Sequence, residues 1–453
     1  MSTPALATPI TDCQGFTPEA PQTIADTGLP VSMIEQLILK DLYFRGDLSG
    51  RDIANELGFA FSLIEELLEN FKRHHVIDAK RSLGMGNISA YFSLSEAGRK
   101  LAQEALTTNQ YSGRAPVPLE QYEAAVRAQR LNRGWVTPEN LRTAYSHMVV
   151  ADDIMTQIGP AVNSGKSFLV YGQPGNGKTY LAEALFNIDS SPVYVPYAIE
   201  CMGRIIRVFD PVYHHPIEEP GEQDSVLTAF AGSTTTDRRW IKCKRPFIVT
   251  GGELTIEMLE LHLNTTTNVY DAPMQMKSNN GIYLIDDFGR QRVSPAEVLN
   301  RWIVPLERRI DYLNLQTGGK ITVPFEVFLV FSTNMQPESL GDEAFLRRIQ
   351  YKMYLRNPKL NEFLEIFELE CRRNDVHCPR ERIERVVREQ YLHTGRAFRR
   401  CHPRDVIAKA IDLISFESLT QELTVDVLNR AFAANFVSSV SDDDTEIRES
   451  LCA

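Results

Sequence analysis

Residues 167–186 have the sequence Ser-Phe-Leu-Val-Tyr-Gly-Gln-Pro-Gly-Asn-Gly-Lys-Thr-Tyr-Leu-Ala-Glu-Ala-Leu-Phe. The apolar residues 167–171 predict a buried strand, and residues 180–186 predict a helix. The glycines of the intervening segment Gly172–Thr179 let backbone N–H groups turn inward around phosphate oxygens. The N-terminus of the following helix adds a partial positive charge. We therefore predict a phosphate-binding loop on a parallel α/β sheet.

The loop also predicts how a nucleotide is held. Lys178 is expected to reach the β and γ phosphates, and the Thr179 hydroxyl is expected to bind Mg²⁺. The predicted ligand is therefore ATP with Mg²⁺. The residues predicted to contact it are Gly172, Gln173, Pro174, Gly175, Asn176, Gly177, Lys178, Thr179 and Tyr180. A chance glycine loop is the alternative, and the position of the match between a strand and a helix disfavours it.

Polar side chains end two later apolar segments. Gly281–Ile285 is followed by Asp286 and Asp287, and Val327–Ser332 is followed closely by Asn334. Asp286 is expected to hold Mg²⁺, and Asp287 is expected to orient and deprotonate a water molecule. The alternative for both segments is turn chemistry, since Asp and Asn also favour turns after a strand.

Arginines follow in two further places. The segment Asp342–Ile349 contains Arg347 and Arg348, and the segment Cys401–Ile407 begins a predicted helix that carries Arg404. Pro403 suits the first turn of that helix. From about residue 351 to residue 437 the apolar periodicity is helical, which predicts a small all-helical domain.

In this order the motifs resemble those of AAA+ ATPases over roughly residues 140–437, and the MoxR-type branch is a candidate closer relative. The resemblance implies a P-loop parallel-sheet core with a helical C-terminal lid. It makes Asp286 and Asp287 a Walker B pair and Asn334 a sensor 1 residue, placed near the γ-phosphate. Asp287 departs from the commonest pattern, which has glutamate there, and this puts the hydrolysis rate in question.

The same resemblance implies roles for the arginines. Arg348, or otherwise Arg347, matches the arginine finger that reaches the ATP of a neighbouring subunit, and a guanidinium suits phosphate oxygens. A surface ion pair is the alternative. Arg404 resembles sensor 2, pointing from the lid to the phosphates. An ion pair with Asp405 is its alternative, and three nearby arginines compete for the role: Arg396, Arg399 and Arg400.

Residues 31–107 predict three helices, a hairpin and a closing helix, which resemble a winged helix-turn-helix domain. Its third helix would read DNA in that family, but it begins with Glu65, Glu66 and Glu69. Phosphates repel such a face. We therefore favour a protein client or partner for this domain and keep DNA as the alternative.

The remaining segments complete the predicted organisation. The chain is expected to have a disordered tail at 1–30, a linker at 108–140, the nucleotide-binding domain at 141–350, the lid at 351–437 and an acidic tail at 438–453. Residues 197–280 are too long for a simple crossover and predict an insertion. Within it, Asp237–Gly251 is basic and predicts a β-hairpin that contacts a nucleic acid, an acidic protein or only solvent. Val293–Leu315 predicts one amphipathic helix.

Composition bounds the cellular setting. The net charge of −11 argues against general nucleic-acid binding, and the seven scattered cysteines favour a reducing compartment. We see no signal peptide and no apolar run of membrane-spanning length, so the cytoplasm is expected, without membrane partners. The predicted function is an ATPase that forms a ring, with a hexamer expected, and remodels a protein or nucleic-acid client. The alternative is a nucleotide-dependent switch or DNA-binding regulator with little turnover.

Overall fold

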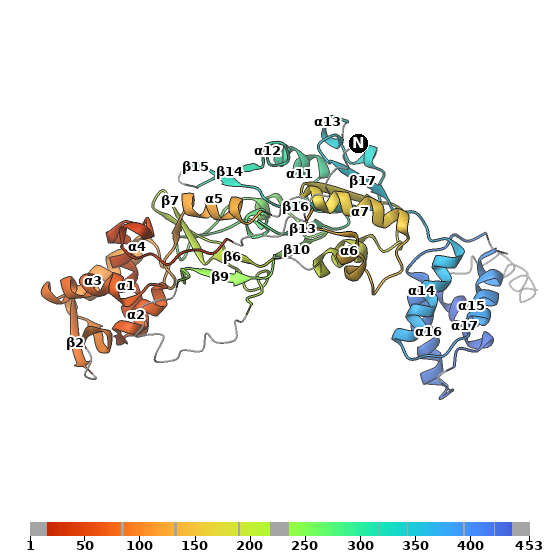
Figure 1. Ribbon diagram of the computed structural model, residues 1–453, viewed down its shortest axis with the longest axis horizontal. Coiled ribbons are helices and arrows are strands. Elements are labelled where there is room, and N and C mark those ends of the chain that lie inside the picture. Colours follow the sequence, from red (N-terminus) through yellow and green to blue (C-terminus); the bar gives the residue numbers. More distant parts are fainter. Residues whose placement is uncertain are drawn as a thin grey trace, which may run out of the picture.

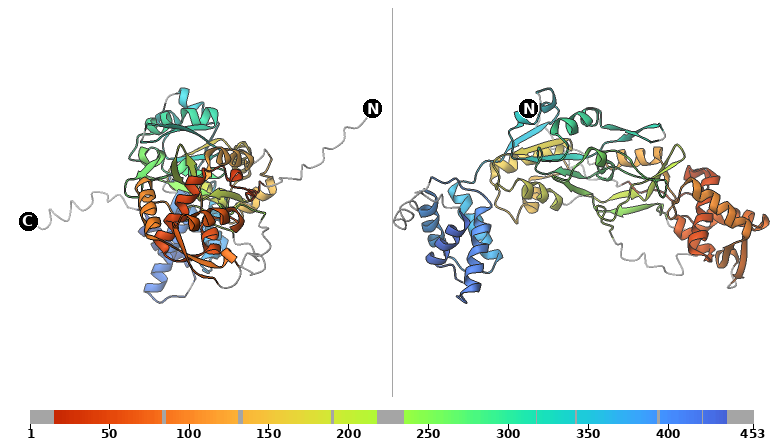
Figure 2. Two further views of the ribbon diagram at one scale, coloured as in Figure 1. Left: turned by 90° about the vertical axis from the view of Figure 1, so that its left-hand side faces the viewer. Right: turned by 180° about the vertical axis from the view of Figure 1, so that it is seen from behind.

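The computed structural model has three parts in chain order along its longest axis (Figures 1 and 2). A red-to-orange N-terminal domain lies at one end, an α/β domain lies in the middle, and a blue helical domain lies at the other end. The expected acidic tail at 438–453 lies outside the described residues. These are residues 16–82, 86–130, 134–188, 191–217, 235–316, 318–341, 343–392, 395–420 and 422–436.

The central domain is built on a five-stranded sheet in which every neighbouring pair is parallel. Its carboxyl ends therefore meet at one edge, where ligands of open α/β sheets bind. The predicted α/β class of the core is confirmed. In spatial order the strands are β10 (Phe247–Thr250), β13 (Ile282–Ile285), β16 (Phe328–Thr333), β5 (Ser167–Tyr171) and β17 (Tyr351–Tyr354).

Successive side chains of a strand point to opposite faces of the sheet, and in the central apolar strands both sets are buried. Helices therefore cover both faces of this sheet. Phe168 and Val170 of β5 belong to one apolar cluster, and Leu169 between them belongs to the other. The first cluster includes side chains of α6 (Pro138–Ala144), α7 (Asp152–Ser164), α8 (Lys178–Glu183) and η3 (Ala184–Asn187). The second includes α11 (Pro295–Arg301) and the fully buried Trp302, just before α12 (Ile303–Arg308).

Two strand predictions were wrong in their pairing. The apolar run Pro192–Val195 predicts a further strand of the core sheet, but β6 (Val193–Pro196) pairs antiparallel with β9 (Trp240–Cys243) outside that sheet. The expected hairpin within 237–251 does not form, because β9 and β10 belong to different sheets. A short apolar run indicates a strand but does not specify its partner.

Strands also appear where helix was expected. The expected helix 293–315 ends early, because Arg309 adopts a left-handed φ of 59° after α12. The chain then forms β14 (Ile310–Asn314), which pairs antiparallel with β15 (Lys320–Pro324). The region expected to be helical from residue 351 begins instead with β17, which pairs parallel with β5 at the edge of the core sheet.

The insertion and part of the expected linker form a second, mixed five-stranded sheet. The expected linker also contains α5 (Leu119–Ala128), whose Tyr122 is buried and accepts a hydrogen bond from Asn279 Nδ2 at 2.8 Å. Residues 108–140 are thus largely packed. In spatial order, the strands of this second sheet are β11 (His262–Asn264), β12 (Val269–Asp271), β8 (Arg204–Arg207), β7 (Ala198–Cys201) and β4 (Val117–Pro118). The insertion also contains the short elements η4 (Ile256–Leu259) and α10 (Met274–Lys277), and η5 (Pro337–Ser339) and α13 (Glu343–Leu346) lie between β16 and β17.

The N-terminal domain contains the predicted helices around a small antiparallel sheet with strand order β1-β3-β2. Ser49 caps α2 in a reciprocal capping box with Asp52, and Gly58 ends that helix at a φ of 78°. Residues 16–30, expected to be a free tail, include η1 (Ala25–Thr27) and a bridge to Thr236. The elements are α1 (Val31–Arg45), β1 (Leu48–Ser49), α2 (Gly50–Leu57), α3 (Phe61–Arg73), β2 (Ile77–Ser82), η2 (Gly86–Ile88), β3 (Ala90–Leu94) and α4 (Glu96–Thr108).

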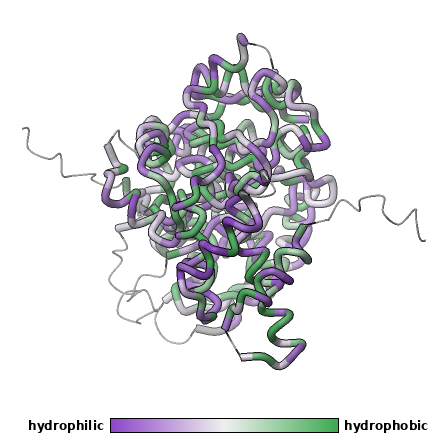
Figure 3. Tube along the Cα trace, turned by 90° about the vertical axis from the view of Figure 1, so that its right-hand side faces the viewer, coloured by the Kyte–Doolittle hydropathy of each residue, from purple (hydrophilic) through white to green (hydrophobic). Residues whose placement is uncertain are grey.

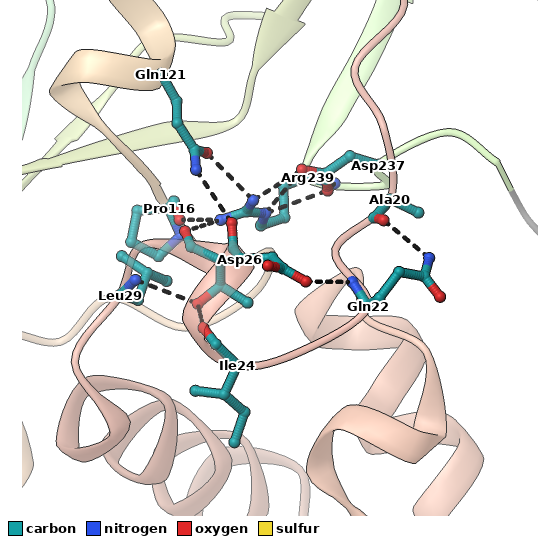
Figure 4. A network of polar contacts seen from close by, with 10 residues as sticks. Ala20, Gln22, Ile24, Asp26, Leu29, Pro116, Gln121, Asp237 and Arg239 are labelled. Carbon is teal, nitrogen blue, oxygen red and sulfur yellow. Dashed lines mark hydrogen bonds and ion pairs between the residues drawn. The ribbon is translucent and has the colours of Figure 1, made fainter.

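Arg239 of the insertion forms a buried ion pair with Asp237 and also joins the insertion to the N-terminal segment (Figure 4). Arg239 and Asp237 are 2% and 3% exposed, and Arg239 Nη2 lies 2.8 Å from Asp237 Oδ2. The guanidinium also donates to Thr27 O at 3.0 Å and to Pro116 O at 3.2 Å, and it lies over the Phe59 ring. One side chain of the insertion therefore ties three segments together.

A buried carboxyl group in α1 makes the stability of this domain depend on pH. Asp41 is fully buried and accepts a hydrogen bond from Ser112; burial raises its pKa from 3.8 to about 6, against the opposing effect of that bond. Between these two values the unfolded chain has lost this proton while the folded chain keeps it, so stability falls as pH rises through that window. Above it, ionised Asp41 costs about 3 kcal/mol.

We therefore expect Asp41→Asn to raise the free energy of unfolding at neutral pH by about that amount. The advantage over wild type should shrink as pH falls below 6 and vanish near 4, because both chains then carry a neutral group. Urea denaturation across this range measures it. A variant that is less stable than wild type at neutral pH would contradict the expectation.

The C-terminal domain is entirely helical among its described residues (Figure 1). Hydrophobic and hydrophilic stretches alternate along its helices at short intervals (Figure 3). In the described parts of the chain, no helix combines the length and the apolar character needed to cross a bilayer. The elements are α14 (Leu360–Arg373), α15 (Arg380–Val387), the π-helical turn η6 (Arg388–Leu392), α16 (His402–Phe416) and α17 (Val425–Asn435).

Candidate nucleotide site

The glycine-rich loop connects the carboxyl end of β5 to α8, and its glycines adopt backbone conformations that other residues avoid. Gly172, Gly175 and Gly177 have φ values of 151°, 78° and 76°. A Cβ atom on Gly172 would lie 2.5 Å from Leu355 O, and one on Gly175 would lie 2.7 Å from Cys401 Sγ. A Cβ on Gly177 would meet nothing within 4 Å. The loop is thus tightly packed on its β17 and lid sides and open where α8 begins.

Lys178 lies at the centre of this loop. Its Nζ donates to Gly172 O and Gln173 O, each at 3.1 Å, and to Asn334 Oδ1 at 2.6 Å. Burial lowers the pKa of this ammonium, and the charges of Asp287 and Asp286 oppose that shift. The loop therefore holds a positive charge among neutral oxygens, which phosphate oxygens can replace as partners.

Thr179 and Asp286 lie side by side. Thr179 Oγ1 is 2.8 Å from each carboxylate oxygen of Asp286, which follows the last residue of β13. Glu183, one turn along α8, has a raised pKa because of its burial and the charge of Asp286. A hydroxyl and a carboxylate are hard oxygen donors of the kind that Mg²⁺ prefers. These two residues fit the predicted metal ligands.

Asp287 and Asn334 meet across two neighbouring strand ends. Asn334 Nδ2 donates to Asp287 Oδ1 at 2.9 Å, while the oxygen of the same amide accepts from Lys178. Asp287 has a φ of 47°, a conformation that costs free energy in a residue other than glycine. The structure thus brings Lys178, Asn334 and Asp287 into one hydrogen-bonded chain beside the Thr179–Asp286 pair.

The connection between β17 and the lid reaches the loop through Asn357. Its Oδ1 accepts from Asn176 Nδ2 at 2.8 Å and from Arg399 Nη1 at 2.9 Å. Because a guanidinium only donates, Asn357 must present its oxygen, and Asn176 must then present its Nδ2. Arg399 Nη2 also lies 3.5 Å from Gln173 Oε1. Sequence reasoning missed Asn357, whose only signal is an Asn-Pro step before the lid.

Arg399, rather than Arg404, is the lid arginine beside the loop. Arg404 was predicted to point to the phosphates, but its side chain is 71% exposed and pairs with Asp405 at 2.9 Å. The reason is the way the lid docks. Cys401 N donates to Gly175 O at 2.9 Å, so the residues just before α16 face the loop.

Arg347 and Arg348 lie away from this chain's own loop. Arg348 O accepts from Ser167 Oγ at 3.2 Å, and Ser167 begins β5 whereas the loop follows its other end. Arg348 Nε lies 2.7 Å from Glu307 Oε1, and Arg347 is exposed. Tyr180 is 42% exposed and packs edge-on against His147, with ring centroids 5.5 Å apart.

Comparison with known proteins adds little to this geometry. A family model described as a domain of unknown function, DUF8689, matches residues 359–434, which form most of the lid. No curated protein matches the chain. Because the solved structures that resemble this chain superpose on it with low TM-scores, we infer function from the residues of the site.

Two solved structures illustrate those likenesses. RuvB from Thermotoga maritima, a Holliday junction branch migration motor, is 14% identical, with a TM-score of 0.33 over 71% of this chain and 79% of its own. NtrX from Brucella abortus is 12% identical, with a TM-score of 0.37 over 78% of this chain and 70% of its own.

Proposed function

We propose that this protein is an AAA+ ATPase that binds Mg-ATP at the glycine-rich loop and hydrolyses it. The observation that carries the proposal is the hydrogen-bonded chain from Lys178 through Asn334 to Asp287, next to Thr179 and Asp286. Together these residues supply a cation, a pair of metal ligands, an orienting amide and a carboxylate base at the sheet edge formed by the carboxyl ends of the strands. Such a set suits phosphoryl transfer to water, which depends on positioning and charge stabilisation.

Each side chain has a task in this proposal. Lys178 exchanges its loop carbonyls for phosphate oxygens, and Asp287 orients a water molecule and accepts its proton. Asn334 holds that carboxylate in place. Arg399, anchored by Asn357, contributes positive charge from the lid side. Bound Mg²⁺ would neutralise phosphate charge, with Thr179 and Asp286 as its ligands.

A ring oligomer, with a hexamer as the expected size, is part of the proposal. Arg348 lies at the opposite end of β5 from the chain's own loop and Arg347 is exposed, so in this proposal the arginine finger acts on the nucleotide of another subunit. In that arrangement Arg348 would leave its partner Glu307, or Arg347 would reach across the interface from its exposed position.

We propose that the client is a protein and that it binds to the N-terminal domain, which resembles a winged helix. Two lysines on the face that would meet DNA are already paired with carboxylates. Lys72 lies 3.1 Å from Glu69, and Lys80 lies 3.0 Å from Asp47. A lysine that is already paired with a carboxylate neutralises DNA phosphates poorly and therefore releases few of their counterions. Counterion release is a large source of DNA affinity. DNA remains the alternative client.

The proposal is tested by measuring ATP binding, hydrolysis and light scattering with wild type and Lys178→Ala. We expect wild type to turn over ATP and to assemble with nucleotide, and the variant to lose binding. Lys100→Ala, which changes an exposed lysine in α4, is the matched control. Wild type that binds ATP without turnover or assembly would favour the switch with little turnover. Wild type that fails to bind ATP would overturn the proposal.

The lid contact gives a separate expected result. Arg399→Ala is expected to lower kcat/KM for ATP by roughly 10- to 100-fold, because it removes a preorganised donor beside the loop. Arg404→Ala is expected to leave kcat/KM within about twofold, since an exposed ion pair contributes little. Steady-state kinetics of both variants provide the comparison. Equal losses in the two variants would contradict the assignment.

A further inference from the structure

A second cavity lies at the edge of the core sheet opposite the glycine-rich loop. Its volume is about 460 Å³, which is within the range of small-molecule sites. The residues that begin three parallel strands line it, namely Phe247, Ile282 and Phe328. Gly165, just before β5, also lines it, whereas the loop follows the other end of that strand. The cavity is therefore separate from the nucleotide site.

One wall of the cavity is aromatic. Phe186 and Phe247 have ring centroids 5.6 Å apart, and Trp135 completes this wall. Phe186 is 43% exposed, and both other rings are half-buried. The two phenylalanine rings are tilted by 50° relative to each other, so folding leaves an aromatic recess in contact with water, where an apolar ring would bind favourably.

The remaining wall carries an excess of positive charge. Arg130, Lys244 and Arg309 line it, and Glu326 is its only acidic lining residue within the described chain. That carboxylate lies 3.1 Å from Arg309 and 3.5 Å from Arg130. Arg245 also lines the cavity, so a single carboxylate cannot balance the four cations, and Lys244 is exposed. The wall therefore favours an anion.

The guanidinium at the base of the cavity is held in a fixed position. Arg309 donates to Gly165 O at 3.0 Å and to Val327 O at 3.2 Å, in addition to its bond with Glu326. Arg245 is anchored in the same way, to Asn280 O at 2.7 Å and to Gln129 O at 3.0 Å. Such preorganised charge needs little ordering when a ligand binds.

We propose that this cavity binds a small anion that carries an aromatic ring. The ring packs against Phe186, Phe247 and Trp135, and the anionic group lies towards Lys244 and Arg130. The ligand also contacts the end of α7, which leads into β5, and η3, which follows α8. It thereby contacts the neighbours of β5 and α8, the two elements that flank the loop, and can regulate the nucleotide site without sharing it.

The probe for the test is 1-anilinonaphthalene-8-sulfonate, an aromatic sulfonate whose fluorescence rises in apolar surroundings. We expect saturable binding at about one molecule per chain, with energy transfer from Trp135. Trp135→Phe is expected to keep the aromatic wall and binding but lose most of this transfer. The other two tryptophans, Trp240 and Trp302, lie outside the cavity and are buried.

Paired variants locate the site. Lys244→Ala and Phe186→Ala are each expected to weaken binding about tenfold, because each removes one contact of the ligand. The matched controls Lys320→Ala and Phe416→Ala change an exposed lysine and an exposed aromatic elsewhere and are expected to bind as wild type does. All four substitutions are at exposed positions, and circular dichroism checks their folding.

Three outcomes would overturn the proposal. Unchanged affinity in both Lys244→Ala and Phe186→Ala would place the probe elsewhere. Equal affinity for neutral N-phenyl-1-naphthylamine would remove the need for an anion. Displacement by single-stranded oligonucleotides, but not by small aromatic acids, would assign the surface to a polymer. Repeating the titration in Lys178→Ala, with binding expected to persist, keeps this result independent of the nucleotide site.

Discussion

Asp287→Asn is expected to lower kcat for ATP hydrolysis by roughly 10²- to 10⁴-fold while leaving ATP affinity nearly unchanged. The substitution removes the proton acceptor and keeps the size of the side chain. Its amide oxygen can still accept the hydrogen bond that Asn334 Nδ2 donates at 2.9 Å, so the geometry of the strand edge is retained. The substitution leaves Lys178 and the rest of the loop, which bind phosphate, in place. Single-turnover hydrolysis and binding of a fluorescent ATP analogue measure the two quantities.

The control for this substitution is Asp405→Asn, which makes the same chemical change at a carboxylate paired with exposed Arg404. We expect its kcat to match wild type. If Asp287→Asn hydrolysed ATP at the wild-type rate, another group would have to be the base. Loss of ATP binding along with turnover would instead show that Asp287 supports the fold of the site.

Arg239→Met is expected to lower the free energy of unfolding by about 3–5 kcal/mol, because it leaves the buried Asp237 without its charged partner. The substitution also removes the bonds to Thr27 O and Pro116 O, which join the N-terminal segment and β4 to the insertion. Urea denaturation followed by circular dichroism measures the loss. Limited proteolysis is expected to separate the N-terminal domain from the core more rapidly in the variant.

Two further variants sharpen this result. Arg238→Met changes the neighbouring arginine, whose Nη1 donates to Asn55 Oδ1 at 2.9 Å, and is expected to cost no more than about 1 kcal/mol. The double variant Asp237→Leu with Arg239→Met removes both charges and is expected to recover much of the stability. A single Arg239→Met variant as stable as wild type would show that the ion pair does not hold the domains together.

The local chemistry of the site could be predicted from the sequence because it resides in contiguous residues. The segment from Gly172 to Thr179 carries its own turn-forming glycines, its cation and its hydroxyl. Asp286 and Asn334 each follow an apolar strand, and parallel strands bring such ends to one edge.

What the sequence could not specify is which surfaces meet. Arg399 and Arg404 lie in one segment, and only the docking of Cys401 on Gly175 O turns the first of them towards the loop. The parallel pairing of β10 with β13 could not be predicted either, because a short apolar run indicates a strand but does not specify its neighbour.

The basic stretch near Trp240 shows the same division between sequence and tertiary structure. By itself it indicated a solvent-facing or ligand-binding hairpin, yet Arg239 is one of its residues and is buried at a junction of three segments. The sequence determined the nucleotide chemistry, because those residues are adjacent or end neighbouring strands. The tertiary structure alone decided the lid contact, the ion pair at the domain junction and the second cavity, because each joins residues distant in the chain.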